Sequence, residues 1–272
     1  PNTPVITTPT AVTATASGLV QGVYTFELVV TDGSTIAKDT VQVTVNAAVS
    51  GGGTSPVVSA VNTQFSRNGT SVNTLTGVPA GALLVLSVAQ EYDIDDLGAP
   101  HATITSSPAL TWTKRADAQA ATSGNAEIYT AVYPAGGSIT VTSAWVSGAL
   151  SSVVHVITNY DPASYIGASS VVNLQTSPSV AITTTQSNSL IIGVTSDYAA
   201  INGALRVYRD GATESFYEFG AGAYAAYDYR KPTTTIGTYT EGLTVPTGMK
   251  AGTALLEIKG RAAAVTPLIA YA

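Results

Sequence analysis

The stretch Gly124–Asp161, GNAEIYTAVYPAGGSITVTSAWVSGALSSVVHVITNYD, decides the fold class of this chain. In its first part Ile128, Thr130 and Val132 share one parity, and aromatic and small side chains fill the other. A period of two puts successive side chains on opposite faces of a strand, and β-branched and aromatic residues favour that environment. The glycines of Pro134–Gly137 allow the positive φ of a reversing turn. The stretch therefore predicts three consecutive antiparallel strands.

The composition narrows the class of protein. The chain has 272 residues, of which 45% are hydrophobic and only 10% charged, with a formal net charge of −6. Globular proteins usually carry about 25% charged residues. An acidic excess opposes binding to nucleic acid or anionic membranes, because both partners are negatively charged. Cysteine is absent, which excludes disulfides, thiol catalysis and Cys-ligated zinc. No apolar run reaches the roughly 18 residues of a membrane-spanning helix.

The first 48 residues contain two strand-like runs, ASGLVQGVYTFELVVTDG at 16–33 and DTVQVTV at 39–45. These runs resemble the C-terminal half of a PKD-type immunoglobulin-like domain, with its GL-x-x-G-x-Y-x-F-x-L-x-V-x-D segment and final D-T-V-x-V-x-V strand. The matching residues are Gly18, Leu19, Gly22, Tyr24, Phe26, Leu28, Val30, Asp32, Asp39, Thr40, Val41, Val43 and Val45. The resemblance implies a partial immunoglobulin-like sandwich at 1–48. We expect its missing strands upstream of Pro1 or in a neighbouring chain.

The rest of the chain divides at a run of small residues. Residues 49–56 are rich in Gly and predict a linker. Residues 57–260 contain about a dozen strand signals without a capped helical pattern. They predict one larger antiparallel, two-sheet, jelly-roll-like β-sandwich, so that the whole chain is all-β. Residues 261–272 are an Ala-rich tail.

The predicted sandwich also carries a second resemblance. Its segments GALLVLSV at 81–88 and LTWTKR at 110–115, with the central stretch, resemble a β-sandwich module of large bacterial and phage surface proteins. Asn159 departs from that pattern, since such modules often carry Gly there. The resemblance implies an adhesive or structural role.

Three carboxylates follow a strong strand signal. Asp93, Asp95 and Asp96 lie in the segment EYDIDDLG, and carboxylate oxygens are ligands that Ca²⁺ prefers. The spacing is not that of an EF-hand. A calcium site and a merely solvated acidic loop both remain open, and no other cofactor is expected.

Aromatic residues are concentrated late in the chain, where seven of the fourteen tyrosines lie between residues 198 and 239. Tyrosine combines an apolar ring with a polar tip and suits sugar stacking or protein interfaces. We predict a ligand or contact patch at Tyr217, Phe219, Tyr224, Tyr227 and Tyr229. The alternative is that about half of these rings belong to the sandwich core.

Catalytic patterns are weak. His155 lies mid-strand among valines, and we expect a buried, hydrogen-bonded core residue. Glu257 lies between Leu256 and Ile258, which are expected to face inward, so its carboxylate is expected to face solvent. A nucleophile elbow and a paired-carboxylate run on one strand are both absent from the sequence. We therefore expect a protein that is not an enzyme.

These observations favour a non-catalytic, extracellular structural or adhesion protein. It would display β-sandwich modules on a cell, filament or virion surface and contact other protein modules or subunits, as a homo-oligomer or filament in one version. The alternative is a carbohydrate-binding module of a secreted polysaccharide-degrading protein, in which glycans bind the tyrosine-rich patch.

Overall fold

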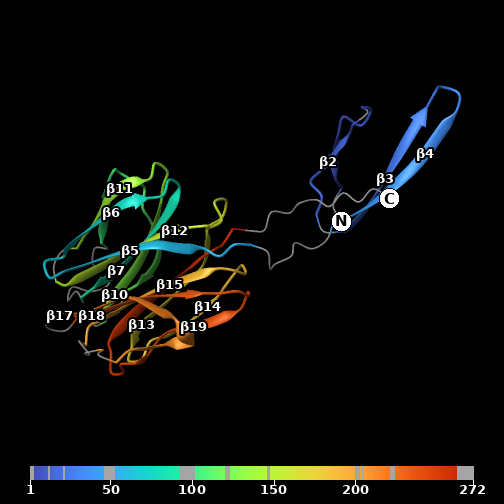
Figure 1. Cartoon of the computed structure of the whole chain (residues 1–272). Coiled ribbons are helices and arrows are strands. Elements are labelled where there is room, and N and C mark those ends of the chain that lie inside the picture. Colours follow the sequence, from blue (N-terminus) through green and yellow to red (C-terminus); the bar gives the residue numbers. More distant parts are fainter. Residues whose placement is uncertain are drawn as a thin grey trace. The chain divides into compact units, whose positions relative to one another are not determined.

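The computed structural model describes residues 3–11, 13–20, 22–45, 53–91, 102–119, 123–145, 148–199, 203, 205–220 and 224–261. Strands dominate, and the one helical element among these residues is a 3-10 turn, η1 (Arg209–Gly211). The predicted all-β fold is therefore confirmed (Figure 1). The chain divides into two compact units at Gly52–Gly53, inside the predicted linker. No helix in the described ranges is long and apolar enough to cross a membrane.

The first unit contains two pairs of antiparallel strands. Short strands β1 (Val5–Thr7) and β2 (Thr15–Ser17) pair with each other. β3 (Gly22–Thr31) and β4 (Ile36–Val45), of ten residues each, form a hairpin without a register shift. The hairpin turn is fixed by Asp32, whose Oδ1 accepts the backbone N–H groups of Ser34 at 2.9 Å and Thr35 at 2.7 Å. The strands predicted from the two runs of the first 48 residues are thus present.

The second unit begins with a sandwich of two sheets. Its larger sheet has the order β5-β12-β7-β10-β9, and its smaller sheet has the order β6-β11-β8. The strands are β5 (Val57–Ser66), β6 (Thr70–Val78), β7 (Ala82–Gln90), β8 (Thr103–Ser107), β9 (Thr113–Ala118), β10 (Asn125–Tyr133), β11 (Gly137–Ala144) and β12 (Leu150–Thr158). The three strands predicted in the central stretch are β10, β11 and β12.

A second sandwich follows with its own pair of sheets. Their orders are β13-β20-β15-β18-β17 and β14-β19-β16. The strands are β13 (Ile166–Gln175), β14 (Ser179–Thr183), β15 (Leu190–Asp197), β16 (Val207–Tyr208), β17 (Thr213–Gly220), β18 (Tyr224–Pro232), β19 (Thr238–Val245) and β20 (Ala251–Ile258).

The two sandwiches share one topology. Counted from the first strand of each, both have the order 1-8-3-6-5 in the larger sheet and 2-7-4 in the smaller. This is an eight-stranded, double-sheet arrangement of the jelly-roll type. The sandwich architecture is as predicted, but the region holds two such sandwiches and four sheets where the sequence analysis expected one sandwich of two sheets. The region is an internal repeat.

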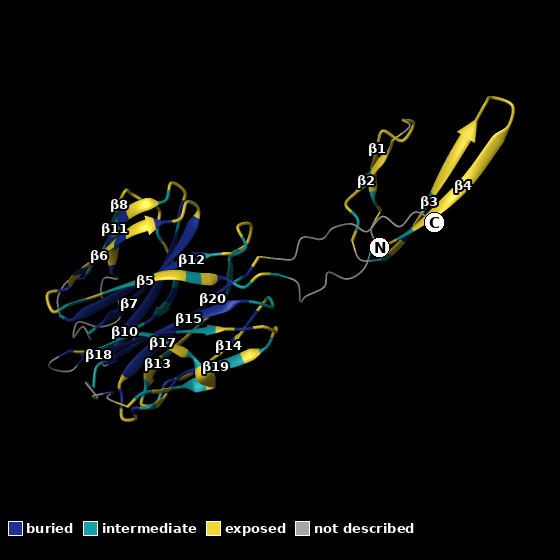
Figure 2. Cartoon of the chain, in the orientation of Figure 1, coloured by how far each residue is buried: buried dark blue, intermediate teal, exposed yellow. Residues whose placement is uncertain are grey.

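The larger sheets of the two sandwiches pack face to face. One buried cluster takes Leu83, Val85 and Ile128 from the first sandwich and Ile192 and Leu256 from the second. Figure 2 shows the buried residues concentrated on β7, β10, β15 and β20, the inner strands of these sheets. Each sandwich also has its own core between its larger and smaller sheets. The second unit therefore has four layers, with the inter-sandwich core in the middle.

Register makes corresponding residues identifiable. The central strands carry matching apolar triplets, Leu83-Leu84-Val85 near the start of β7 and Leu190-Ile191-Ile192 at the start of β15, and we align the two sandwiches on these triplets. In the neighbouring strands, Val156 pairs with Leu84 and Glu257 pairs with Ile191. Because Leu84 and Ile191 occupy the same position in the two sandwiches, Val156 is the counterpart of Glu257. The same reasoning makes Leu256 the counterpart of His155.

Candidate functional site

The predicted tyrosine patch does not form one surface. Tyr224, Tyr227 and Tyr229 are fully buried, the first between the sandwiches and the other two in the core of the second sandwich. Burial is the main cause that raises the pKa of Tyr229 above its usual value. On β17, Tyr217 is half-buried and Phe219 is 39% exposed. Of the five residues, two therefore reach the surface.

Tyr217 belongs to a polar cluster that is satisfied internally. The guanidinium of Arg206 lies 4.0 Å from the centroid of the Tyr217 ring and donates to Glu214 at 2.5 and 2.8 Å. Those hydrogen bonds hold the pKa of Glu214 below its usual range. The Tyr217 hydroxyl accepts the N–H of Gly203 at 2.9 Å. The cluster thus ties Gly203 and Arg206 to β17, which is a structural role.

A second polar cluster, around the buried carboxylate of Glu127, lies in the first sandwich. Glu127 is 1% exposed and accepts hydrogen bonds from Gln90 at 3.1 Å, the Ala102 N–H at 3.2 Å and the Tyr129 hydroxyl at 2.9 Å. Lys114 lies 4.0 Å from its other oxygen. These hydrogen bonds hold the buried carboxylate in place.

The predicted calcium ligands Asp93, Asp95 and Asp96 lie outside the described residues. Within the described part of the chain, no three side chains of the types that ligate metals come together.

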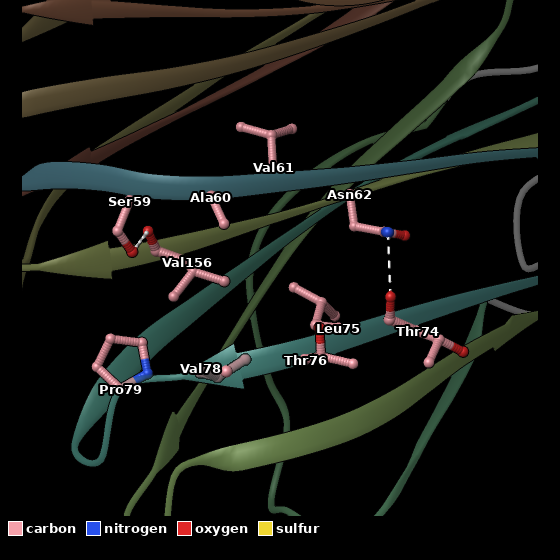
Figure 3. A pocket seen from close by; sticks show the side chains of 11 residues that line it. Ser59, Ala60, Val61, Asn62, Thr74, Leu75, Thr76, Val78, Pro79 and Val156 are labelled. Atoms are coloured by element: carbon pink, nitrogen blue, oxygen red, sulfur yellow. Dashed lines mark hydrogen bonds between the residues drawn. The ribbon is translucent and has the colours of Figure 1, made fainter.

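A groove of about 270 Å³ opens between the edge strands β5 and β6 of the first sandwich (Figure 3). Leu75, Val78 and Val156 are buried beneath it and give it an apolar floor. Asn62 crosses from β5 to β6 by donating to the Thr74 carbonyl at 3.1 Å. The groove therefore combines an apolar floor with a polar rim.

The matching space in the second sandwich is filled. Glu257, the counterpart of Val156, is fully buried there, which corrects the expectation that it faces solvent. Its carboxylate accepts hydrogen bonds from the N–H groups of Ala168 at 2.9 Å and Thr185 at 2.9 Å, and from the Ser189 hydroxyl at 2.7 Å. A Cβ on Gly167 would lie 2.0 Å from the same carboxylate. The repeat thus has one closed and one open version of this site.

The first sandwich lacks the residues that donate hydrogen bonds to Glu257 in the second, and this explains the difference. Counting from Leu83 and Leu190, the counterparts of Thr185, Gln186 and Ser189 are Val78, Pro79 and Ala82. None of these side chains donates a hydrogen bond, and proline lacks a backbone N–H as well. An acid at position 156 would have few donors, and the first sandwich has Val156 at this position.

The edges beside the two sites also differ. β5 has a single register shift, next to Val156, and its sequence VVSAVNTQFS contains no charge and no proline. β13 is interrupted twice, between Ile166 and Ser169 and between Val172 and Gln175. Bulges, charges and prolines are the usual means of protecting a sheet edge from pairing. β5 lacks these protections over most of its length.

Sequence analysis did not predict this groove, because its lining residues are ordinary strand residues. The one signal in the sequence was the absence of charge from 57–66. An uncharged strand indicates a pairing surface only when it is known to lie at the edge of a sheet. Comparison with family models, with curated proteins and with solved structures finds no match to this chain.

Proposed function

We propose that this chain is a non-catalytic structural or adhesion protein that acts outside the cell, through contacts between β-surfaces. The observation that carries the proposal is that the chain presents two contact features of the same kind. One is the β3–β4 hairpin, whose apolar face exposes Leu28, Val30 and Val41. The other is the uncharged β5 edge with its groove. Both features suit pairing with other β-structure.

Three further observations support this role. The buried carboxylates Glu127 and Glu257 are held by hydrogen bonds within the fold, so both serve the structure of the sandwiches. The charged share of 10% leaves surfaces that are largely neutral and polar. The resemblance of residues 1–48 to a PKD-type domain, whose modules serve as spacers, agrees with display on a surface.

Immunolabelling of the intact native source tests the location. Antibodies raised against residues 53–261 should label unpermeabilised cells, filaments or virions, with preimmune serum as the control. Label that appears only after permeabilisation would contradict an extracellular role.

A carbohydrate-binding role is the second candidate, supported by the exposure of Phe219 and Tyr217 on β17. A glycan array tests it with the wild-type chain and Phe219→Ala. Binding that Phe219→Ala removes, with an unchanged far-ultraviolet dichroism spectrum, would favour this candidate. We expect no glycan signal, because three of the five predicted aromatic residues are buried.

A further inference from the structure

One face of the β3–β4 hairpin is more apolar than the other, and we call it the apolar face. Tyr24, Phe26, Leu28 and Val30 share a face, together with their cross-strand partners on β4. Of these, Leu28 is 63% exposed and Val30 is 56% exposed. The opposite face carries the ion pair between Lys38 and Glu27 at 3.1 Å and several threonines, with Val23, Val29 and Ile36 spaced among them. A two-stranded sheet with an uncovered apolar face is marginally stable in water, so a covering partner would stabilise it.

Stacking of two such hairpins face to face is disfavoured. Asp39 pairs with Leu28 and therefore lies on the apolar face. A symmetric stack would bury the Asp39 carboxylates of both copies against apolar side chains, and an unpaired buried charge is costly. Pairing through the free edge of β3 avoids this, because β4 and Asp39 then stay on the outer side.

The β5 edge offers a matching acceptor. β5 and β3 are both ten residues long, and β5 carries no charge that would repel a partner. A strand added beside β5 would cover the groove and place alternate side chains over Leu75, Val78 and Val156. Asn73 already donates to the Asn62 carbonyl at 3.1 Å, but that oxygen keeps a second lone pair.

We propose that the β3–β4 hairpin of one copy of this chain adds to the β5 edge of a second copy, with its apolar face over the groove. The closed counterpart in the second sandwich, plugged by Glu257 and bulged along β13, leaves one acceptor of this type in the described chain. One donor and one acceptor on different surfaces make a heterologous, head-to-tail contact, which propagates into filaments or closes into rings. The inference deepens the structural role proposed above by naming the partner.

Sedimentation of the full chain at roughly 1 to 100 µM tests the contact, since that range covers moderate affinities. We expect the weight-average mass of the wild type to rise at least twofold over the series. Leu28→Asp disables the hairpin face and Ala60→Lys blocks the β5 edge, so each variant alone should remain monomeric. Both positions are exposed, so both variants should fold.

Mixing the two blocked variants gives the decisive result. The intact hairpin of the Ala60→Lys chain should bind the intact edge of the Leu28→Asp chain, giving a one-to-one heterodimer and nothing larger. Val29→Asp, on the opposite face of β3, and Val171→Lys, on the bulged β13 edge, are matched controls that should assemble like the wild type.

Other outcomes overturn the inference. Self-association of Leu28→Asp alone would mean that β5 pairs with itself, and self-association of Ala60→Lys alone would mean that hairpins pair with each other. A monomeric wild type would mean that the hairpin is covered by another segment or another protein. Surface labelling of a protein that stays monomeric would refute the assembly and leave the proposed function standing.

Discussion

Two buried glutamates in the second sandwich have opposite environments. Glu257 is clamped by backbone and side-chain donors, and although burial raises its pKa, the hydrogen bonds from Ala168, Ser189 and Thr185 outweigh burial and lower it. Glu241 is also fully buried, but neither of its carboxylate oxygens accepts a hydrogen bond from a described residue. Burial, with Asp210 nearby, raises the pKa of Glu241 to about 7. One carboxylate stabilises the fold as an anion, and the other is tolerated as an acid.

Glu241 should make stability fall as the pH rises. Its folded-state pKa of about 7 exceeds the ordinary value of 4.5, so the folded chain holds the proton more tightly than the unfolded chain. The free energy of unfolding should therefore decrease between about pH 4.5 and pH 7, by on the order of 3 kcal/mol at most. Glu241→Val should remove this decrease and raise the urea midpoint at pH 8.

The repeat supports that choice of variant. Glu241 pairs with Val180 and Val141 pairs with Asn73, two positions that each lie ten residues before the first leucine of the next strand. Valine is therefore the residue that the first sandwich already holds at this site. The prediction would be contradicted if the free energies of unfolding of wild type and variant, measured with urea, changed in parallel from pH 5 to pH 8.

Glu257→Gln should destabilise the chain, because an amide cannot accept from all the donors that now face the carboxylate. The loss should be about 2–4 kcal/mol at pH 7, typical of breaking charge-assisted hydrogen bonds in a buried site. Since the folded-state pKa is lowered, the contribution of Glu257 is present above pH 4.5 and is lost as the pH falls further. Urea unfolding at pH 7 and pH 3 measures both, and an equal deficit at the two values would be inconsistent with this account.

At the level of elements, close packing between neighbouring strands fixes where glycine is required. The Tyr229 ring on β18 lies over Gly193 on β15, and a Cβ there would come within 2.3 Å of a ring carbon. In the first sandwich the corresponding pair is Tyr129 and Leu86, so the two cores pack differently within one topology.

Gly193→Ala should therefore lower stability by about 1–3 kcal/mol, the usual cost of overpacking a core. Gly237→Ala is the matched control, since its nearest neighbour would be the Tyr239 ring at 3.9 Å. Thermal unfolding of both variants compares them. An equal melting temperature for Gly193→Ala and the wild type would show that the core yields at this point.

Strands are recognisable in the sequence where an apolar or alternating run is unbroken, and they are hard to recognise where the run is short or interrupted. β7 and β15 are apolar runs bounded by turns, so the sequence itself shows them as strands. β8 and β13 give weaker signals, because TITSS is short and polar and β13 is interrupted by two register shifts. A bulge shifts the alternation by one residue, so a period-two pattern is lost along such a strand.

On the scale of the whole molecule, a buried histidine and a buried aspartate meet where the two sandwiches pack together. His155 on β12 and Asp228 on β18 lie 2.9 Å apart, at 0% and 1% side-chain exposure. The predicted burial of His155 is correct, but the expected hydrogen bond is absent, because neither ring nitrogen has a hydrogen-bond partner among the described residues. The Asp228 carboxylate beside the ring comes from the other half of the repeat. By register, the counterparts are Leu256 for His155 and Ile128 for Asp228, both in the inter-sandwich core.

Single and double substitutions should therefore differ. His155→Leu leaves the buried Asp228 carboxylate without the imidazole beside it, and removing one partner of a buried pair should cost about 3–5 kcal/mol. Combining His155→Leu with Asp228→Ile installs the apolar residues already present at the counterpart positions and should recover most of that loss. Urea unfolding of the two singles and the double forms a mutant cycle. Additive losses in the double would mean that the pair does not act as a unit.

The sequence alone determined the fold class, because alternation, turn glycines and β-branched residues are local properties that act within one strand and its turn. It also located the hairpin of the first unit and the boundary before residue 57. Tertiary structure decided that residues 57–260 hold two sandwiches, that Tyr224, Tyr227 and Tyr229 are core, and that Glu257 points inward. Those outcomes depend on which sheet faces are covered, and strands distant in sequence set that coverage. The open groove beside β5 has the same cause. Only the register of the two sandwiches shows that Val156 stands where Glu257 closes the corresponding site.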